Sequence, residues 1–349
     1  MFDLNALLRD NIKKVKPYSS ARDEYSGTEG VFLDANENPY GSVSGGHWNR
    51  YPDPLQHDLK ERLAQLKRVK PEQIFLGNGS DEPIDLLIRA LCAPGKDNII
   101  TVPPTYSMYE VSANINDVAV KEVHLDEQFQ LRVTEVLKAV TPQTKIIFLC
   151  SPNNPTGTSL RTEDIDAVLK GFNGVVVIDE AYIDFAPYRG YTTRLEEFPN
   201  LVVLQTFSKA WGLAALRLGM AFASAEITTV LNRIKPPYNV NAYSQEQGLL
   251  ALKNLLKKED MVADILAERD RLEQELGKLK NVVKFIYPSD ANFIMVKTPD
   301  GDKVYNFLVK EKIITRNRSK VILCEGCIRI TVGTEAENTL LINALAKYQ

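Results

Sequence analysis

The sequence lacks the features that would direct it to a membrane or to a polyanion. Its apolar runs, such as residues 146–150 and 175–178, are far too short to cross a bilayer. Residues 1–18 lack the continuous apolar core of a signal peptide. The formal net charge is only -3, so no excess of one sign indicates a nucleic-acid or membrane-surface partner. We therefore expect a cytoplasmic protein that binds neither nucleic acid nor membrane.

Cysteine and histidine are scarce, with four and three residues among 349. Four cysteines in a chain of this length do not form a disulfide framework. Cys324 and Cys327 form a lone CxxC motif, but the remaining cysteines and the histidines do not have the spacing of zinc ligands. We interpret the two cysteines as ordinary thiols near a turn and expect no metal site.

The pattern of apolar residues predicts an α/β fold. The chain is long enough for about two domains. Between about residues 55 and 235, short apolar strands alternate with helical patterns. Several strands are continuous apolar runs, as expected for a largely parallel sheet that helices cover on both faces. The expected strands are 74–76, 98–102, 118–123, 145–150, 175–178, 201–204 and 220–223.

The pattern changes after Pro236 and Pro237. Ser244 with Gln247 predicts a capping box at the start of a helix. A long, charged amphipathic helix is expected over about 259–279, followed by a smaller α+β unit. The remaining expected elements are strands 293–296 and 327–332, a helix near 302–312 and a helix at the end. The expected division is an N-terminal arm of 1–50 that contributes to the small domain, a large domain of 51–240 and a small C-terminal domain of 241–349.

One apolar strand ends in an acid, in the segment VVVIDEAY at 175–182. This places Asp179 at the carboxyl edge of the sheet, where ligands bind in open α/β folds. An acid in this position is also typical of nucleotide hydrolases, but the GxxxxGK[ST] loop that they need is absent. On this motif alone, an acid that merely caps the next turn remains an alternative.

The segment TFSKAWGLAALRLG at 206–219 places a lysine among aromatic residues and glycine. Lys209 walled from water would have a lowered pKa, so its neutral amine could form an imine with an aldehyde. Arg217 offers a planar fork for a phosphate, and the hydroxyls of Thr206 and Ser208 add donors. A solvated helix face that carries a lysine and an arginine is the alternative.

Three more turns follow expected strands at the same edge of the sheet. In GNGSDEP, the backbone N–H groups near Ser80 and Asp81 begin a helix and can seat a phosphate, although a plain N-cap is an alternative. In SPNNPTGT, Asn154 can donate to a phenolate oxygen of a bound ring. In PTYSMY, Tyr106 can stack on that ring, although a tyrosine of the core or of a turn has the same pattern.

Taken in order, GNGSDE, PTY, SPNNPTG, VIDEAY and TFSKAWGLAALRLG resemble the fold-type-I aminotransferases, which use pyridoxal 5'-phosphate (PLP). The resemblance covers nearly the whole chain. At its ends KPYSSARDEYSG, LDANENPYG, RYPDP, ITRNRS and CIRITVGT resemble the histidinol-phosphate aminotransferase family. This resemblance implies a homodimeric, PLP-dependent enzyme of histidine biosynthesis, in which the arm of 1–50 contributes to dimer contacts and the large domain of 51–240 binds the cofactor. Its implied reaction converts L-histidinol phosphate and 2-oxoglutarate into imidazole-acetol phosphate and L-glutamate.

The resemblance also implies roles for individual residues. Lys209 matches the lysine that holds the cofactor as a Schiff base, and Asp179 matches the acid that faces the pyridine nitrogen. Tyr182 and Asn154 match donors to the ring hydroxyl oxygen, and Tyr106 matches the stacking aromatic. The positions that match the seat of the cofactor phosphate are Ser80, Asp81, Thr206, Ser208 and Arg217.

Other matched positions lie on the substrate and partner sides. Tyr51 matches a tyrosine that reaches the cofactor phosphate from the partner subunit, which implies shared active sites. Arg329 also has an argument of its own, because Ile328 and Ile330 should face one side of a strand and leave Arg329 on the other. A buried guanidinium needs an anion, either in an internal salt bridge or on a substrate, and the resemblance favours the substrate. The matched substrate-side positions are Tyr18, Asn36, Arg316 and Arg329.

Related functions remain open at this point. Trp211 and Ala215 depart from residues common in the family, which leaves details of the pocket undefined. Aromatic-amino-acid aminotransferases and threonine-phosphate decarboxylases share most of these motifs. A PLP-binding effector domain of a transcription regulator is a non-enzymatic alternative. Such a protein would carry a DNA-binding helix-turn-helix ahead of this fold, and no basic two-helix pattern precedes the expected large domain.

Overall fold

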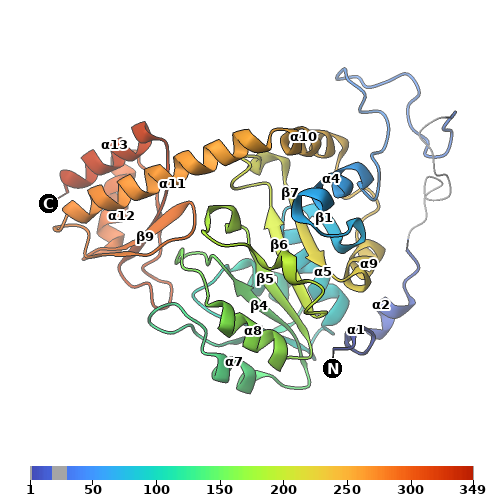
Figure 1. Ribbon diagram of the computed structural model, residues 1–349, viewed down its shortest axis with the longest axis horizontal. Helices are drawn as coiled ribbons and strands as arrows, with labels where there is room; N and C mark the ends of the chain where they lie inside the picture. Colours follow the sequence, from blue (N-terminus) through green and yellow to red (C-terminus); the bar gives the residue numbers. More distant parts are fainter. Residues whose placement is uncertain (1, 18–29, 349) are drawn as a thin grey trace.

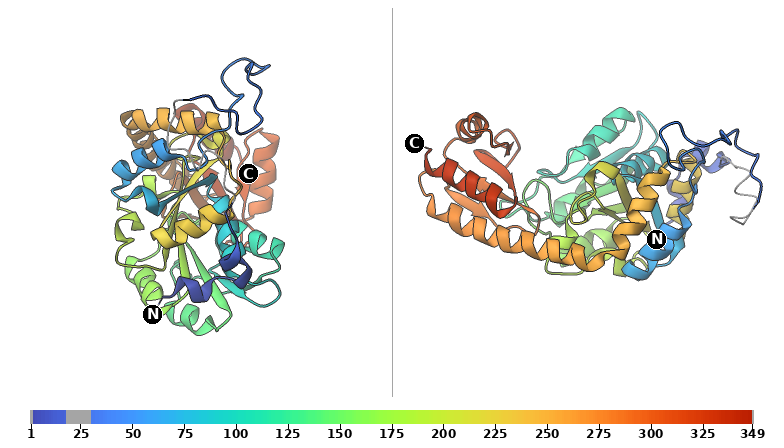
Figure 2. Two further views of the ribbon diagram at one scale, coloured as in Figure 1. Left: turned by 90° about the vertical axis from the view of Figure 1, so that its right-hand side faces the viewer. Right: turned by 90° about the horizontal axis from the view of Figure 1, so that it is seen from above.

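A computed structural model describes residues 2–17 and 30–348, which form two sheets joined by a long helix, α11 (Leu255–Lys278) (Figure 1). The larger sheet has seven strands and the smaller has four. Figure 2 shows α11 running from the side of the larger sheet to the smaller one. The predicted fold class, a mostly parallel α/β sheet with a smaller α+β unit, is confirmed. The proposed division at residues 50 and 240 stays a prediction.

The seven-stranded sheet has the order β1-β7-β6-β5-β4-β2-β3. The strands from β3 to β6 are all parallel, whereas β7 is antiparallel to both β6 and β1. Residues 207–217 connect β6 to β7, which is too short a segment for the helical crossover that parallel neighbours need. Every predicted strand agrees within a residue or two. The bounds are β1 (Ile74–Asn78), β2 (Asn98–Thr101), β3 (Ala119–Glu122), β4 (Thr144–Cys150), β5 (Val175–Asp179), β6 (Leu201–Thr206) and β7 (Leu218–Ala223).

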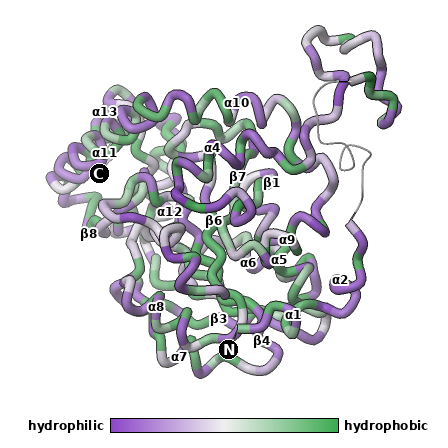
Figure 3. The backbone as a smooth tube through the Cα atoms, turned by 45° about the vertical axis from the view of Figure 1, so that its right-hand side comes forward, coloured by the Kyte–Doolittle hydropathy of each residue, from purple (hydrophilic) through white to green (hydrophobic). Residues whose placement is uncertain are grey.

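Helices cover both faces of this sheet, which explains the continuous apolar strands. In β4, Ile147 and Leu149 pack into one core, while Ile146 and Phe148 pack into the core on the opposite face. Figure 3 shows the apolar stretches gathered in the middle of the molecule, where these strands lie. One core includes α4 (His57–Lys67), α7 (Val133–Ala139) and α8 (Thr162–Gly171). The other includes α5 (Asp81–Leu91), α6 (Met108–Ile115) and α9 (Ala225–Ile234).

The small sheet is antiparallel, with the order β10-β11-β9-β8. Ile294, Ile328 and Ile330 point to one face, where they share a core with Leu272 of α11 and Leu341. The opposite face turns toward the larger sheet. The bounds are β8 (Phe285–Tyr287), β9 (Phe293–Lys297), β10 (Arg316–Asn317), β11 (Cys327–Thr331), α12 (Gly301–Lys310) and α13 (Glu335–Ala346).

The predicted capping box at Ser244 and Gln247 is wrong. Helix α10 (Ala242–Lys253) begins earlier, because the side chain of Asn241 accepts a hydrogen bond from the backbone N–H of Ser244. Ser244 lies inside the helix, and its hydroxyl donates to the carbonyl of Leu216 at 2.9 Å. The long charged helix also begins earlier than expected, at Leu255.

Among residues 2–17 of the N-terminal part lie two short helices, α1 (Leu4–Leu7) and α2 (Asp10–Lys14). Residues 30–50 then project from the body of the molecule (Figure 1). Several apolar side chains of this projecting arm are exposed, among them Tyr40, which is 97% exposed. In the described part of the chain, no helix combines the length and apolar character needed to span a membrane.

Candidate active site

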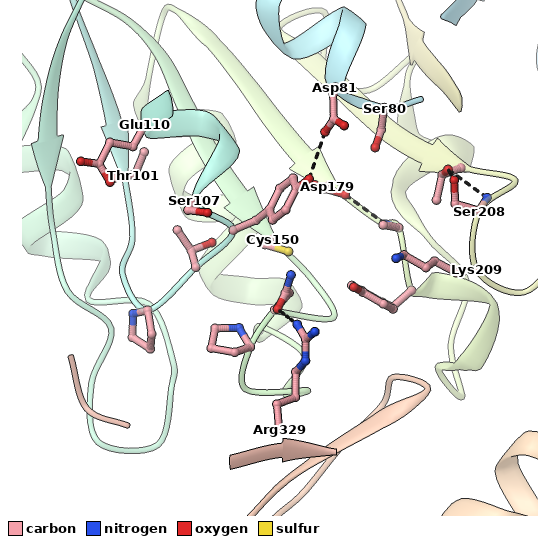
Figure 4. A pocket seen from close by; sticks show the side chains of 18 of the residues that line it. Ser80, Asp81, Thr101, Ser107, Glu110, Cys150, Asp179, Ser208, Lys209 and Arg329 are labelled. Carbon is pink, nitrogen blue, oxygen red and sulfur yellow. Dashed lines mark hydrogen bonds between the residues drawn. The ribbon is translucent and has the colours of Figure 1, made fainter. Parts of the chain in front are cut away.

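A cavity of about 540 Å³ lies between the carboxyl edge of the larger sheet and the small sheet (Figure 4). Two predicted site residues, Asn36 and Tyr51, line a separate hollow of about 380 Å³ beside the projecting arm. Tyr18 lies outside the described residues. The predicted residues that line the main cavity are Ser80, Asp81, Tyr106, Asn154, Asp179, Tyr182, Thr206, Ser208, Lys209, Arg217, Arg316 and Arg329.

Asp179 ends β5 at the floor of the cavity and is only 3% exposed. The hydroxyl of Tyr109 donates to one carboxylate oxygen at 2.7 Å. The backbone N–H of Ala181 donates to the other oxygen at 3.1 Å, which is the turn-capping bond considered from the sequence. Burial raises the pKa of Asp179 to about 6, although these two hydrogen bonds lower it. A cationic group in the cavity would favour the ionised carboxylate.

Lys209 follows β6, in a loop that Phe207 and Trp211 anchor in the core. Its amine lies 5.6 Å from the centre of the Tyr182 ring. Burial lowers the pKa of Lys209, and the positive charge of Arg329 lowers it further. No residue in the described ranges forms a hydrogen bond or an ion pair with this amine. The lowered pKa increases the share of Lys209 that is present as the neutral, nucleophilic amine.

The start of α5 and the end of the Lys209 loop form a polar seat beside this amine. Ser80 occupies the N-cap position of α5, but its side chain makes no capping hydrogen bond. The hydroxyl of Thr206 donates to that of Ser208 at 3.0 Å, and the guanidinium of Arg217 lies 3.4 Å from Asp81. Unpaired N–H groups at a helix start, hydroxyls and a guanidinium together suit a phosphate.

The backbone around this seat is tightly constrained. Arg217 has a φ of 50°, a left-handed conformation that is uncommon for residues other than glycine. Its carbonyl accepts a hydrogen bond from the N–H of Gly79 at 2.7 Å. A Cβ atom added to Gly79 would lie 2.8 Å from the Arg217 guanidinium, and one added to Gly219 would lie 2.2 Å from the Gly79 backbone. Only glycine lets these segments approach so closely.

Tyr106 and Tyr182 occupy other walls of the cavity. The Tyr106 hydroxyl donates to Asp81 at 3.1 Å, and its ring meets the ring of Tyr109 edge-on at 5.6 Å. Burial raises the pKa of Tyr182, whose ring packs edge-on against Phe293 at 5.1 Å. Both tyrosines therefore remain protonated and can donate hydrogen bonds at neutral pH.

Arg329 reaches into the cavity from the small sheet (Figure 4). It donates to the side-chain oxygen of Asn154, which leaves the amide nitrogen of Asn154 available as a donor. The guanidinium lies 5.0 Å from the centre of the Phe293 ring, and its Nε is buried without a partner. None of the ion pairs found in the described residues involves Arg329, so the internal salt bridge considered from the sequence is not formed there.

Sequence reasoning missed Tyr109, which is fully buried and bonds to Asp179, and Arg318, which lines the cavity. Tyr109 lies in α6 three residues after Tyr106, which precedes that helix, so the segment PTYSMY carries both tyrosines. Arg318 stands two residues after Arg316, a spacing that could have indicated a shared strand face.

Together these groups fit PLP, a phosphorylated aromatic aldehyde. The free amine of Lys209 can bond to the aldehyde, and the Asp179 carboxylate can face a protonated ring nitrogen. The seat at Ser80 and Arg217 matches a phosphate, and Tyr106 provides an aromatic wall. Among the described residues, no group of three or more acidic, cysteine and histidine side chains could hold a metal ion.

Comparison with known proteins agrees with this site. The family model for aminotransferase class I and II matches residues 26–345. A protein of Cytophaga hutchinsonii named histidinol-phosphate aminotransferase is 62% identical, with 99% of each chain covered. The crystal structure of histidinol-phosphate aminotransferase from Clostridium acetobutylicum matches with a TM-score of 0.79 at 26% identity, covering 86% of this chain and 90% of that one.

A further structural match extends the comparison to the cofactor. The histidinol-phosphate aminotransferase of Sinorhizobium meliloti, solved in complex with pyridoxal-5'-phosphate, has a TM-score of 0.80 at 23% identity, with 90% and 89% of the two chains covered. The predicted resemblance and the predicted cofactor, PLP, are confirmed. The chain belongs to the histidinol-phosphate aminotransferases, within the class I and II aminotransferase family.

Proposed function

We propose that the protein transfers the amino group of L-histidinol phosphate to 2-oxoglutarate, forming imidazole-acetol phosphate and L-glutamate in histidine biosynthesis. One observation carries this proposal: arginines without a carboxylate partner among the described residues face the cavity that holds the reactive amine of Lys209. A substrate that bears an amine and an anionic group could react at the Lys209 site through its amine and pair with the arginines through its anionic group. The name of the Cytophaga hutchinsonii relative indicates which amine this is.

PLP supplies an electron sink for the bond that breaks at the substrate Cα. The residues supply proton transfer and orientation. Because its pKa is lowered, Lys209 can take the proton from Cα as a neutral amine and return it as an acid. Asp179 would hold a proton on the ring nitrogen of bound PLP, and Tyr182 and Asn154 would donate hydrogen bonds to its ring hydroxyl oxygen.

Arg316 and Arg329 would bind the anionic end of either substrate. Histidinol phosphate has no carboxylate, whereas glutamate has two, so one site must accept both kinds of anion. A guanidinium presents a planar fork that pairs with a carboxylate or a phosphate. Arg329 is held by Asn154 and packed on Phe293, so little side-chain entropy is lost when an anion binds.

We also propose a homodimer with shared active sites. Within one subunit, Tyr51 and Asn36 line a hollow that is separate from the main cavity. The projecting arm that carries Asn36 exposes apolar side chains such as Val31, Leu33 and Tyr40, as a segment that packs on a partner would. In the dimer, Tyr51 would then reach the cofactor phosphate of the partner, and Asn36 would lie on the substrate side.

We place this reaction in the cytoplasm, where a biosynthetic enzyme with free thiols would remain reduced. All four of its cysteines are buried and free. Its partners are then small molecules and a second copy of the chain.

Half-reactions of the PLP-loaded enzyme test the proposed function. The absorbance of the cofactor is followed after single additions of histidinol phosphate, histidinol, phenylalanine, tyrosine and threonine phosphate. We expect histidinol phosphate to react with the highest kcat/KM and to form imidazole-acetol phosphate. A preference for the aromatic amino acids would identify an aromatic-amino-acid aminotransferase. Release of carbon dioxide from threonine phosphate would identify a decarboxylase, and no reaction with any amine would favour the effector-domain alternative.

A further inference from the structure

Three arginines share one face of the small sheet. Arg316 of β10 lies directly opposite Arg329 of β11. The backbone N–H of Arg318 donates to the carbonyl of Cys327 at 2.9 Å, so the pairing of the two strands continues to Arg318. Because side chains alternate along a strand, Arg318 points to the same face as Arg316, while Ile328 points into the core on the other face. All three arginines line the active-site cavity.

This cluster concentrates positive charge without a counter-ion of its own. Arg318 is half-buried, and its Nε is buried without a hydrogen-bond partner. Burial lowers the pKa of Arg318, and the charges of Arg329 and Arg316 lower it further. The ion pairs found in the described part of the chain include none of the three arginines. Like charges on facing strand positions are unfavourable, so the arrangement is stabilised only when an anion enters.

The acidic side chains that line the cavity come from the larger sheet and its helices, and not from the small sheet that carries the arginines. Asp179 and Asp81 are hydrogen-bonded to tyrosines of the large domain. Glu110 and Glu122 belong to α6 and β3, also in the larger sheet unit. In Figure 4, Asp81, Asp179 and Glu110 extend from that side, whereas Arg329 extends from the small sheet. The arginine side of the cavity is therefore left for the substrate.

We propose that Arg318 is a specificity-determining residue that makes the site prefer a phosphate monoester to a carboxylate. This inference rests on the proposed function and assigns the discrimination to one side chain. A carboxylate has two oxygens and one charge, which Arg316 and Arg329 can satisfy. A phosphate monoester has three terminal oxygens and a charge of about -1.5 to -2 at pH 7. Its third oxygen and additional charge are matched by the third guanidinium, Arg318, whose Nε has no other partner.

Two variants of the PLP-loaded enzyme test this role. Arg318→Gln removes the charge at similar length, and Arg318→Lys keeps the charge without the planar fork. Lys320→Gln is the matched control, because it removes one positive charge from an exposed position of the same segment that does not line the cavity. Thermal unfolding of each variant checks that the fold is kept.

We expect Arg318→Gln to raise the KM for histidinol phosphate at least about tenfold, with kcat changed by less than about twofold. The KM for glutamate should change by less than about threefold. Arg318→Lys should recover part of the loss, and Lys320→Gln should resemble the wild type. Equal losses for both substrates, or no loss for either, would overturn the assigned discrimination.

Inhibition by simple anions separates this inference from the proposed function. Inorganic phosphate and succinate are tested as competitive inhibitors of the glutamate half-reaction. In Arg318→Gln we expect inhibition by phosphate to weaken at least about fivefold and inhibition by succinate to change by less than about twofold. If the wild type does not react with histidinol phosphate, the proposed function fails, but this selective loss would still support Arg318 as a phosphate-binding group. Unchanged inhibition by phosphate would overturn the inference whichever amine is the substrate.

Discussion

Replacement of Asp179 by asparagine should stabilise the protein without cofactor and at the same time damage the enzyme. The carboxyl group is fully buried, and burial raises its pKa from 3.8 to about 6. This upward shift means that the folded state disfavours the ionised form, by about 3 kcal/mol at neutral pH. The Asp179→Asn side chain can still accept from the Ala181 N–H and can donate to the Tyr109 oxygen. Because the bond to Tyr109 then loses its charge, we expect a net gain of about 1–3 kcal/mol.

The gain depends on pH in a defined direction. Above about pH 6, Asp179 of the wild type is ionised in the folded protein, and the full cost is present. As the pH falls from about 6 toward the unfolded value of about 4, the folded wild type takes up a proton and the cost disappears. The advantage of Asp179→Asn should therefore be largest at neutral pH and smallest near pH 4.

Urea unfolding of the cofactor-free proteins at pH 7.5 and pH 5 measures this effect. Asp270→Asn makes the same substitution at an exposed position of α11 and controls for the change in net charge. Addition of PLP should reverse the order, because a protonated ring nitrogen pairs with the carboxylate and not with the amide. Turnover of the variant should fall on the order of several hundredfold, because the activation free energy rises by about 2–4 kcal/mol.

Either of two results would refute this reasoning. A cofactor-free Asp179→Asn protein that is less stable than the wild type at pH 7.5 would mean that the buried charge of Asp179 does not destabilise the folded protein. A stability difference that stays constant between pH 7.5 and pH 5 would mean that the carboxyl group does not titrate in this range.

Three further changes test other parts of the site. Gly219→Ala should weaken PLP binding and lower the melting temperature, since its Cβ would lie 2.2 Å from the backbone of the turn before α5. The control Gly277→Ala has open space around it and should be neutral or stabilising by up to about 1 kcal/mol. Arg329→Ala should lower kcat/KM at least about tenfold in the histidinol phosphate and glutamate half-reactions alike, and a loss confined to one of them would count against a shared anion site. Inactive Tyr51→Ala and Lys209→Ala chains should regain activity when mixed, since a hybrid dimer contains one intact site; no recovery after verified subunit exchange would argue against sharing.

The strands, and the residues at the carboxyl edge of the sheet, could be predicted because both depend on local sequence. The run at 175–178 is apolar on both faces, so it predicts a covered strand, and the acid that follows it must lie at the strand end. The position of Asp179 near Lys209 followed from the same argument. The antiparallel direction of β7 was less accessible, because it depends on how a short loop packs and not on the apolar pattern.

Other features depend on contacts between distant residues. The hydrogen bond from Tyr109 to Asp179 joins positions 70 residues apart, and neither segment alone indicates it. The helix start at Asn241 was missed because two candidate caps lie close together, and the competing Ser244 hydroxyl bonds to Leu216. Asn36 and Tyr51 were assigned to the site by resemblance, yet they line a different hollow of the same subunit. The proposed assembly of two chains would bring them to the cavity.

Chemical labelling can identify the lysine that carries the cofactor. The PLP-loaded wild type is reduced with borohydride, digested, and mapped by mass spectrometry. Lys209 is the lysine that lines the cavity in the described chain, and its amine forms no hydrogen bond or ion pair with the described residues. We expect the reduced cofactor on Lys209, and we expect Lys209→Ala to be neither labelled nor active. Stoichiometric label on another lysine, or full turnover by Lys209→Ala, would contradict it.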